Sequence, residues 1–484
     1  MTSGSLERDT NGGASSYDDL ATSLPSAEAA AAESSASLTS SMAFMESIDK
    51  GLPQAAEFSD GSLDPLWGKR TESGDTGSLQ RLDVETIRLL TTYARQLDEV
   101  SRLWYDYAAL ISAPKTTLVD LTTFESTYRS ALASLEVQAT ASVKLLEVRL
   151  DRSTIDHCHV FTAAYLAGRP SGEALRNRIS ELLIRRPAYR PTLIAGLAWS
   201  ELTTPDDLAW LLESTVPVVR AAGLLVCSQQ GIVPEAALEE SLAASSDQEL
   251  ACCALRVVGE LALESARDII EARLVERGKH AIAPRCWAAR SAALLGDRDL
   301  AVDVLRRFSL SRAVTLRRVA LEIAPRLPKP GSRQWFRSLV EELGVCEEAV
   351  AAVTATGLPH YGPALIRFMA EPELKEAAAY GFAMITGFDP LAAAMTADDG
   401  QDPVSLAQHW WEHQGITLER GQRHLLGQPI GVEHCRRILD DEALTLRQRT
   451  AAALEYALLV PQQPLLDLFG PSERQRRRLA QCRF

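Results

Sequence analysis

The stretch PVVRAAGLLVCSQQG, residues 217–231, decides the fold class of this 484-residue chain. Its apolar residues recur at i, i+3, i+4 and i+7, which is the spacing of a helix with one buried face. The small residues Ala221, Ala222 and Gly223 allow a second helix to come close. Gly231 closes the segment, so the sequence predicts a short helix packed against a neighbour.

The same pattern returns along the middle of the chain. A closing glycine or proline falls roughly every 30 to 37 residues, the period of a helix–turn–helix repeat. Later segments with apolar, arginine or small residues in a similar order lie at 252–258, 286–295, 316–320, 350–353 and 377–382. One helix pair cannot bury its apolar face alone, so adjacent pairs are expected to stack into a HEAT-like α-solenoid over residues 169–390. A non-repetitive helical bundle is the alternative.

The regions on either side of the repeats have different patterns. Within residues 78–168, two long apolar stripes separated by Pro114 predict a helical hairpin that caps the first repeat. Residues 391–484 form a less regular C-terminal helical region with a Trp-Trp and a Gly-x-Arg-x-Leu-x-Gly segment. The predicted fold is therefore all-α: a HEAT-like α-solenoid with an N-terminal long helical hairpin and a disordered N-terminal tail.

The tail, residues 1–77, carries most of the negative charge. It has 13 acidic and 4 basic side chains, a net charge of −9 out of −14 for the whole chain. Its few large apolar residues cannot offset the entropy lost on ordering, so disorder is expected. Two apolar islands, 42–48 and 63–67, are either docking motifs or incidental hydrophobic residues.

The remaining chain is only mildly acidic and shows no concentrated basic groove, which argues against nucleic acid as the main partner. The one basic cluster, Arg474 with Arg476–Arg478, is expected to be a solvated helix end. No stretch of 18 apolar residues predicts a membrane span, and no secretory signal is recognised. Eight cysteines without CxxC pairing suggest buried thiols and a cytoplasmic location.

The motif closest to known chemistry is His409-Trp410-Trp411-Glu412-His413. The H-x-x-E-H pattern is the inverted zinc-peptidase signature, with two histidines on one helical face and a glutamate as base. A third ligand would have to come from elsewhere, for example Glu433 or His434. Such peptidases need strands, which the sequence does not predict, so a structural role for the two tryptophans is the simpler interpretation.

Two further groups of residues are candidates for chemical sites. The two histidines of His157-Cys158-His159 cannot share a helical face with the cysteine, so a solvated or capping role is expected. Cys252-Cys253 lies within a predicted buried helix, without the histidine and positive surroundings that a nucleophile needs. No catalytic residue and no cofactor site is predicted.

Arginines recur near the apolar face of the second helix of each repeat. They are Arg220, Arg256, Arg290, Arg317 and Arg318. They could bind an acidic partner, or they could join neighbouring repeats through Glu213, Glu239 and Glu271. The sequence leaves these two roles open.

Several short segments resemble an uncharacterised family of HEAT-like repeat proteins from proteobacteria, often encoded beside type VI secretion genes. The likeness covers roughly residues 84–480. It rests on Leu103-Trp104, 117–121, Gly362, Leu365-Ile366, Pro372, 383–387, Trp410-Trp411, Gly421, Arg423, Leu425, Gly427 and 449–452. The family has an aromatic residue after the arginine, where this chain has His424, and the family's acidic, histidine-containing stretch before Leu103-Trp104 is changed. The resemblance implies a fold and a secretion context, but no reaction.

The expected function is a non-enzymatic protein-interaction scaffold or adaptor associated with type VI secretion. Its candidate contact residues are Arg220, Arg256, Arg290, Arg317, Trp410, Trp411 and Arg423. The alternatives are a HEAT-like enzyme or ligand-handling protein, of the nucleic-acid or pigment-lyase type, and then a zinc metallopeptidase using His409, Glu412 and His413.

Overall fold

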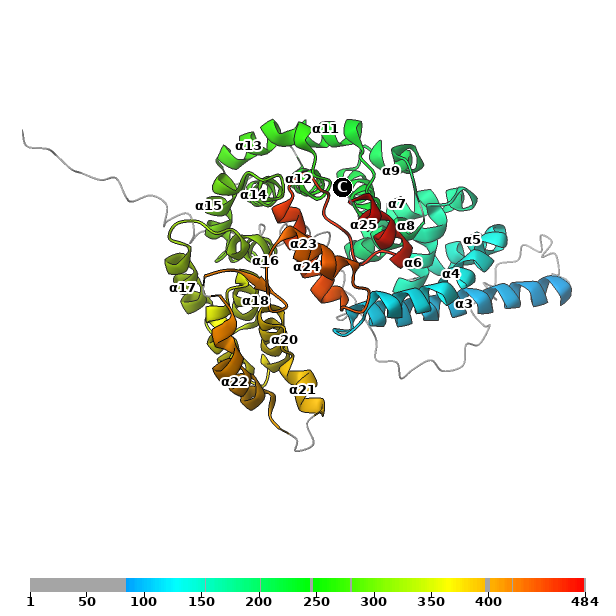
Figure 1. Cartoon of the computed structure of the whole chain (residues 1–484). Helices are drawn as coiled ribbons and strands as arrows, with labels where there is room; N and C mark the ends of the chain where they lie inside the picture. Colours follow the sequence, from blue (N-terminus) through cyan, green and yellow to red (C-terminus); the bar gives the residue numbers. More distant parts are fainter. Residues whose placement is uncertain are drawn as a thin grey trace, which may run out of the picture.

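The computed structural model describes residues 84–152, 154–200, 202–243, 247–278, 281–396, 401–419 and 421–482. This part of the chain is an all-α structure, as predicted (Figure 1). The predicted disordered tail and its two apolar islands lie outside the described residues. None of the helices in these ranges combines the length and the apolar character that crossing a bilayer requires.

A helical hairpin begins the described chain. Helix α3 (Val84–Ser112) packs against α4 (Leu118–Val137), which starts with a capping box between Thr117 and Asp120. The second apolar stripe of the sequence runs from Leu118 to Leu150 and predicts one long helix, but two helices form instead. Gln138 leaves the helical region, with φ −113° and ψ 31°, and α5 (Ala139–Leu150) follows it. The break lets α5 pack against both α3 and the next helix of the chain, and no glycine or proline marks it.

The solenoid has two layers, in which each inner helix contacts the next inner helix. The inner layer consists of α6 (His157–Ala167), α8 (Arg190–Trp199), α10 (Pro217–Gln230), α12 (Gln248–Glu260), α14 (Ile282–Leu294), α16 (Val314–Ile323), α18 (Glu347–Thr356) and α20 (Lys375–Thr386). The outer layer consists of α7 (Arg176–Arg185), α9 (Ala209–Leu212), α11 (Glu235–Ala243), α13 (Arg267–Val275), α15 (Arg298–Phe308), α17 (Ser332–Leu343) and α19 (Gly362–Met369). The layers form an arc in Figure 1. The inner layer starts at α6, before the expected boundary at residue 169.

Short 3-10 helices lie between these elements. They are η3 (Pro170–Leu175), η4 (Pro187–Tyr189), η5 (Pro205–Leu208), η6 (Glu264–Ala266), η8 (Ala324–Arg326), η9 (Pro359–Tyr361) and η10 (Gly415–Thr417). An outer helix returns the chain after each inner helix, so the inner helices all run in one direction. Their C-terminal ends therefore lie at one edge of the arc and their N-terminal ends at the other.

Small residues bring the inner helices close together, as the sequence predicts. A Cβ added to Gly259 of α12 would lie 2.5 Å from the Ser291 hydroxyl oxygen of α14. On α14, Ala288, Ala289, Ala292 and Ala293 are fully buried. Larger side chains at these positions would force the two helices apart.

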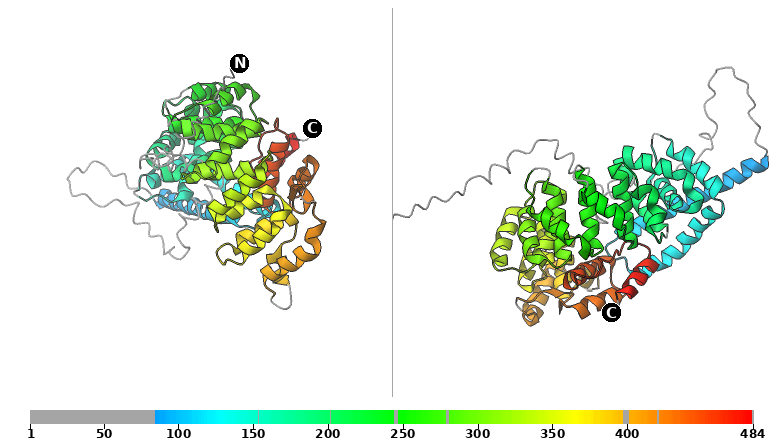
Figure 2. Two further views of the ribbon diagram at one scale, coloured as in Figure 1. Left: turned by 90° about the vertical axis from the view of Figure 1, so that its left-hand side faces the viewer. Right: turned by 90° about the horizontal axis from the view of Figure 1, so that it is seen from above.

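After the last repeat the chain turns back on itself. Helices α21 (Pro390–Thr396) and α22 (Pro403–Gln414) pack on each other, and α22 packs on α19. A two-residue hairpin follows, β1 (His424–Leu425) with β2 (Gln428–Pro429), which the sequence did not predict. Helices α23 (Val432–Asp440), α24 (Leu446–Leu459) and α25 (Ser472–Gln481) then lie inside the arc in Figure 1 and along one side of the molecule in Figure 2.

The hairpin is joined to the ends of α18 and α20. The His424 amide donates to the Gly357 carbonyl (2.6 Å), and the Leu426 and Gly427 amides donate to the carbonyls of Met384 (2.6 Å) and Ile385 (3.2 Å). Residues 383–387 and the Gly-x-Arg-x-Leu-x-Gly segment, both part of the family resemblance in the sequence, therefore contact each other.

Two glycines with similar backbone angles, Gly427 at this contact and Gly331 away from it, allow its close packing to be tested. Gly427 has φ 77°, and a Cβ there would lie 2.6 Å from the Thr386 carbonyl oxygen. Gly331 has φ 80° with nothing within 4 Å of the same position. Gly331→Ala should therefore lose only the left-handed backbone preference, roughly 1–2 kcal/mol. Gly427→Ala should lower the thermal midpoint further, and equal midpoints for the two variants would contradict this account.

Candidate functional site

The C-terminal segment, residues 423–482, covers the C-terminal ends of the inner helices. Its donors bond carbonyls of five inner helices, α8, α10, α12, α18 and α20. The bonds are Arg474 to Ala198, Arg478 to Ser228 and Gln229, the Leu465 amide to Glu260, Arg423 to Ala355 and Thr356, and the Leu426 amide to Met384. Between these points, Arg298 donates to the Leu458 carbonyl and Arg326 pairs with Glu455 at 3.0 Å. One edge of the solenoid is thus occupied by the chain itself.

Two of the predicted contact arginines join neighbouring repeats. Arg220 donates to the Ser214 carbonyl (3.1 Å) and pairs with Glu240 (3.2 Å). Arg317 repeats this arrangement with the Ser311 carbonyl (3.2 Å) and Glu348 (2.8 Å). Each guanidinium therefore ties the turn before its own helix to an acid on a different helix.

Arg256 and Arg290 share one buried carboxylate. Glu260 lies 2.8 Å from the Arg256 Nε and 3.5 Å from the Arg290 Nη1, and Arg290 also reaches Glu322 at 3.3 Å. Both guanidinium groups lie over the Trp287 ring. Burial alone would raise the pKa of Glu260, but the two guanidinium groups hold it below its ordinary value.

This arrangement decides between the two roles left open for Arg256 and Arg290. They are only 8% and 5% exposed, so neither is free to meet a partner. Arg220, Arg290 and Arg317 do join neighbouring elements, whereas Arg256 pairs with Glu260 of its own helix. The acids paired with these arginines in the described chain are Glu240, Glu260, Glu322 and Glu348. The expected partners Glu213, Glu239 and Glu271 were the wrong acids, because tertiary packing selects which acid is in reach.

The other predicted contact residues are also packed. Trp410 stacks on Phe388 with ring centroids 5.6 Å apart. Trp411 lies between Gly362 and Gly415, where an added Cβ would come within 2.5 Å and 2.7 Å of its ring. Arg423 donates to Glu455 through Nη1 at 2.9 Å. His424 is buried and bonds the Gln422 carbonyl at 3.0 Å.

Among the described residues, no third ligand gathers with His409 and His413 of the zinc-peptidase motif. His409 and His413 have ring centroids 4.2 Å apart, but the His413 Nδ1 donates to the His409 carbonyl at 2.7 Å. His434 donates to the Leu425 carbonyl (2.7 Å), and Glu433 is exposed on α23. Within the described ranges, three potential ligands lie together elsewhere: atoms of Asp156, Cys158 and His159 lie within 4.8 Å of one another.

That second group has surroundings that suit a cation poorly. The Arg149 guanidinium contacts the His159 Nε2 and pairs with Asp98 at 2.5 Å. Burial raises the pKa of Cys158 to about 12, which keeps the thiol protonated. His157 has turned away to bond Thr192 at 2.8 Å. The group is a polar network between the hairpin and the first inner helix.

The expectation that the basic cluster near the C-terminus is a solvated helix end is wrong for two of its four arginines, while Arg477 is exposed and Arg476 partly so. Arg474 and Arg478 on α25 are buried. The N-terminus of α25 meets Glu125 of α4, which is 2% exposed and accepts from the Ser472 amide (2.9 Å) and hydroxyl (2.6 Å). Burial raises the pKa of Glu125, although the hydrogen bonds from Ser472 act to lower it.

Sequence reasoning missed Glu125, although a signal was present. The buried positions of α4 are Leu118, Leu121, Glu125, Tyr128, Leu132 and Leu135. These positions alternate steps of three and four, so the carboxylate stands in the middle of an apolar stripe. A charge at such a position needs a buried partner.

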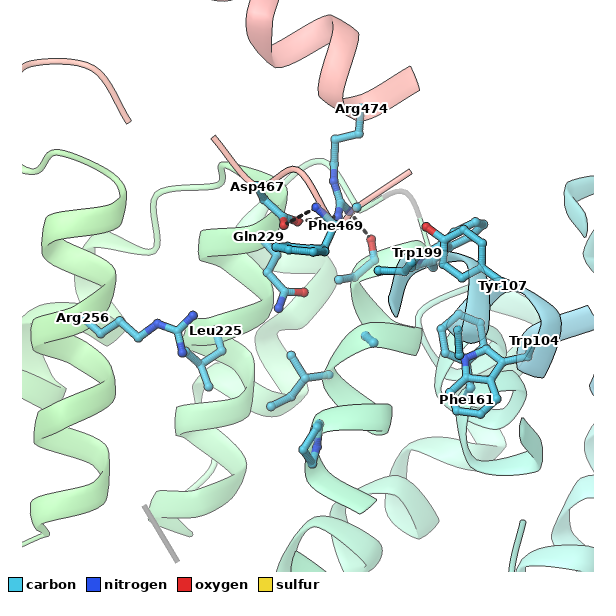
Figure 3. Close-up of a pocket in the computed structure, with 17 residues that line it drawn as sticks. Trp104, Tyr107, Phe161, Trp199, Leu225, Gln229, Arg256, Asp467, Phe469 and Arg474 are labelled. Atoms are coloured by element: carbon cyan, nitrogen blue, oxygen red, sulfur yellow. Dashed lines mark hydrogen bonds and ion pairs between the residues drawn. The ribbon is translucent and has the colours of Figure 1, made fainter. Parts of the chain in front are cut away.

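A small cavity lies beside Arg474 of α25 (Figure 3). Its volume is about 60 Å³, and aromatic side chains line one side of it: Trp104, Tyr107, Phe161 and Trp199. Arg474 reaches down from α25 to Asp467 (3.1 Å) and to the Ala198 carbonyl. The cavity has room for a few water molecules and is smaller than the 150 Å³ that admits benzene.

Comparison with protein-family models gives no match, and comparison with curated proteins gives none either.

The buried charge group leads to a stability prediction. Arg290→Ala removes one of two cations from Glu260 and should destabilise the protein by about 3–5 kcal/mol. Arg220→Ala is the matched control, because its partner Glu240 is largely exposed, and about 1 kcal/mol or less is expected. Chemical unfolding monitored by circular dichroism measures both. Equal losses of stability in the two variants would contradict the view that the buried charge group contributes more than the exposed pair.

Zinc binding provides the second test. Because His413 uses its Nδ1 on its own helix and only two histidines face each other, the full chain should retain far less than one zinc per molecule after incubation and desalting. Elemental analysis of the wild type and His413→Ala should give the same content. One zinc per chain that disappears in the variant would restore the metallopeptidase interpretation.

Proposed function

We propose that this protein is a non-enzymatic interaction scaffold of the cytoplasm that works with components of a type VI secretion system. The scaffold role is supported by a row of exposed apolar side chains. The secretion context is supported by the family resemblance in the sequence. The cytoplasmic location is supported by eight free cysteines, which suit a reducing compartment.

The row lies at the edge opposite the C-terminal segment. Ile282 and Val314 are the first residues of α14 and α16, and Leu310 and Val345 lie in the turns that lead into α16 and α18. Their exposed fractions run from 37% for Ile282 to 67% for Val345. Axes of packed helices are about 8–10 Å apart, so consecutive inner helices place these side chains in one row. Apolar side chains grouped in this way mark interaction surfaces.

The row, here called the apolar edge, differs from the opposite edge in the groups that it presents to a partner. At the C-terminal ends of the inner helices, carbonyls are already bonded by the chain. At the apolar edge, the side chains meet solvent in the described structure. A partner that binds there gains apolar burial without first displacing a part of the scaffold.

A double charge substitution tests the apolar edge. Full-length tagged Val314→Glu/Val345→Glu should lose the partners that the wild type retains when purified from its host. Val137→Glu is the control, because Val137 is 85% exposed at the end of α4, away from the row. A purified partner should bind the double variant at least tenfold more weakly and the control unchanged. Equal loss in both variants, or in neither, would contradict the proposal.

A further inference from the structure

Helix α25 is bound to the rest of the molecule mainly through polar groups. Its buried residues are Ser472, Arg474, Gln475 and Arg478, without a large apolar side chain among them. Leu479 and Cys482 add limited apolar contact with α23 and α24. The helix carries four arginines within five residues, although it lies inside a mildly acidic protein.

The surface under α25, here called the arginine groove, complements this helix at both ends. Glu125 accepts two hydrogen bonds from Ser472 at the N-terminus of α25, where helix dipoles favour negative charge. Arg474 and Arg478, one helical turn apart, donate to the last carbonyls of α8 and α10. Helix C-termini favour cations for the same reason. The groove thus combines a carboxylate with two helix ends at the spacing of i and i+4.

Further donors and acceptors fix the position of α25. The Gln475 amide donates to the carbonyls of Leu468 (2.9 Å) and Gly470 (2.8 Å), and its oxygen accepts from Arg449 at 3.1 Å. Arg476 pairs with Glu442 at 2.6 Å and donates to the Thr122 hydroxyl at 2.8 Å. The contacts of Arg476 are directional hydrogen bonds that another arginine-bearing helix could reproduce, whereas the acceptors of Gln475 lie in the chain that leads into α25.

A polar contact of this kind opens more readily than an apolar core. Water can replace each of these hydrogen bonds when the helix leaves. Segments with few buried apolar contacts open at a lower free energy than the whole protein unfolds. Helix α25 is the last described helix, so its release does not interrupt the solenoid core.

We propose that the arginine groove is a binding site for a basic helix with arginines four residues apart, that α25 is its intramolecular occupant, and that a partner helix with this pattern displaces it. This names a partner class for the proposed scaffold. The partner enters at the covered edge of the arc, whereas the apolar edge serves a separate contact. An experiment that refutes binding at the arginine groove therefore does not refute binding at the apolar edge, and the reverse also holds.

The test uses the full-length chain and a fluorescein-labelled peptide of residues 468–482. In the full-length Arg474→Ala/Arg478→Ala variant the occupant is weakened, so the peptide should bind at least tenfold more tightly than it does to the wild type. A peptide with the same two substitutions should not bind. A scrambled peptide of equal charge, with its arginines out of the i, i+4 register, separates recognition from charge attraction. Adding Glu125→Ala to the variant should abolish binding.

Hydrogen exchange keeps the test decisive if the variant folds poorly. In the wild-type chain, α25 amides should exchange at least a hundredfold faster than those of α12 and α14, and excess peptide should speed the exchange of α25 alone. Equal protection of α25 and α12 would overturn the proposal. So would equal binding of the scrambled peptide, or no binding to a variant whose circular dichroism matches the wild type.

Discussion

The alignment of the inner helices imposes the constraint on which the rest of the structure depends. Each helix leaves its last carbonyls without partners, and each carries partial negative charge at its C-terminus. In a solenoid these ends line up along one edge, so every repeat adds carbonyls that need hydrogen-bond donors. Here the C-terminal segment supplies donors to the ends of α8, α10, α12, α18 and α20 in turn. An edge that would otherwise depend on water is closed by the chain itself.

This constraint also explains why so many arginines are buried in an acidic protein. A guanidinium has five donors in a planar fork, so it can bond a carbonyl and a carboxylate together. Arg423 does this with Thr356 and Glu455, and Arg474 does it with Ala198 and Asp467. Glu455 in turn receives Arg326 as well as Arg423. Glu455 is shared, which limits the buried negative charge while two arginines are still neutralised.

Features that depend on local sequence patterns could be predicted, whereas features that depend on contacts between distant parts of the chain could not. The repeats, the hairpin with its turn at Pro114 and the small-residue contacts followed from periodicity, because each depends on neighbours in sequence. The return of the C-terminal segment did not, because its partners lie far away in the chain, as with Ser472 and Glu125. The break at Gln138 carried no glycine or proline. The acids paired with the repeat arginines were assigned wrongly, because the packing of the helices decides which acid each arginine can reach. Glu125 differs from these, since its place in the apolar stripe of α4 is itself a local signal of a buried charge.

The two edges of the arc differ in the kind of partner that they can select. Apolar side chains such as Val314 and Val345 reward burial but impose little direction, so complementary shape decides what binds there. The carbonyls and Glu125 under α25 impose direction strictly, because a guanidinium misplaced by one residue leaves buried polar groups without partners. An occupant with the right spacing is already encoded in α25, which prevents the groove from accepting stray basic segments. A competing helix must match that spacing and also outweigh the high local concentration of a tethered competitor. Selectivity at this edge thus follows from the same hydrogen bonds that complete the fold.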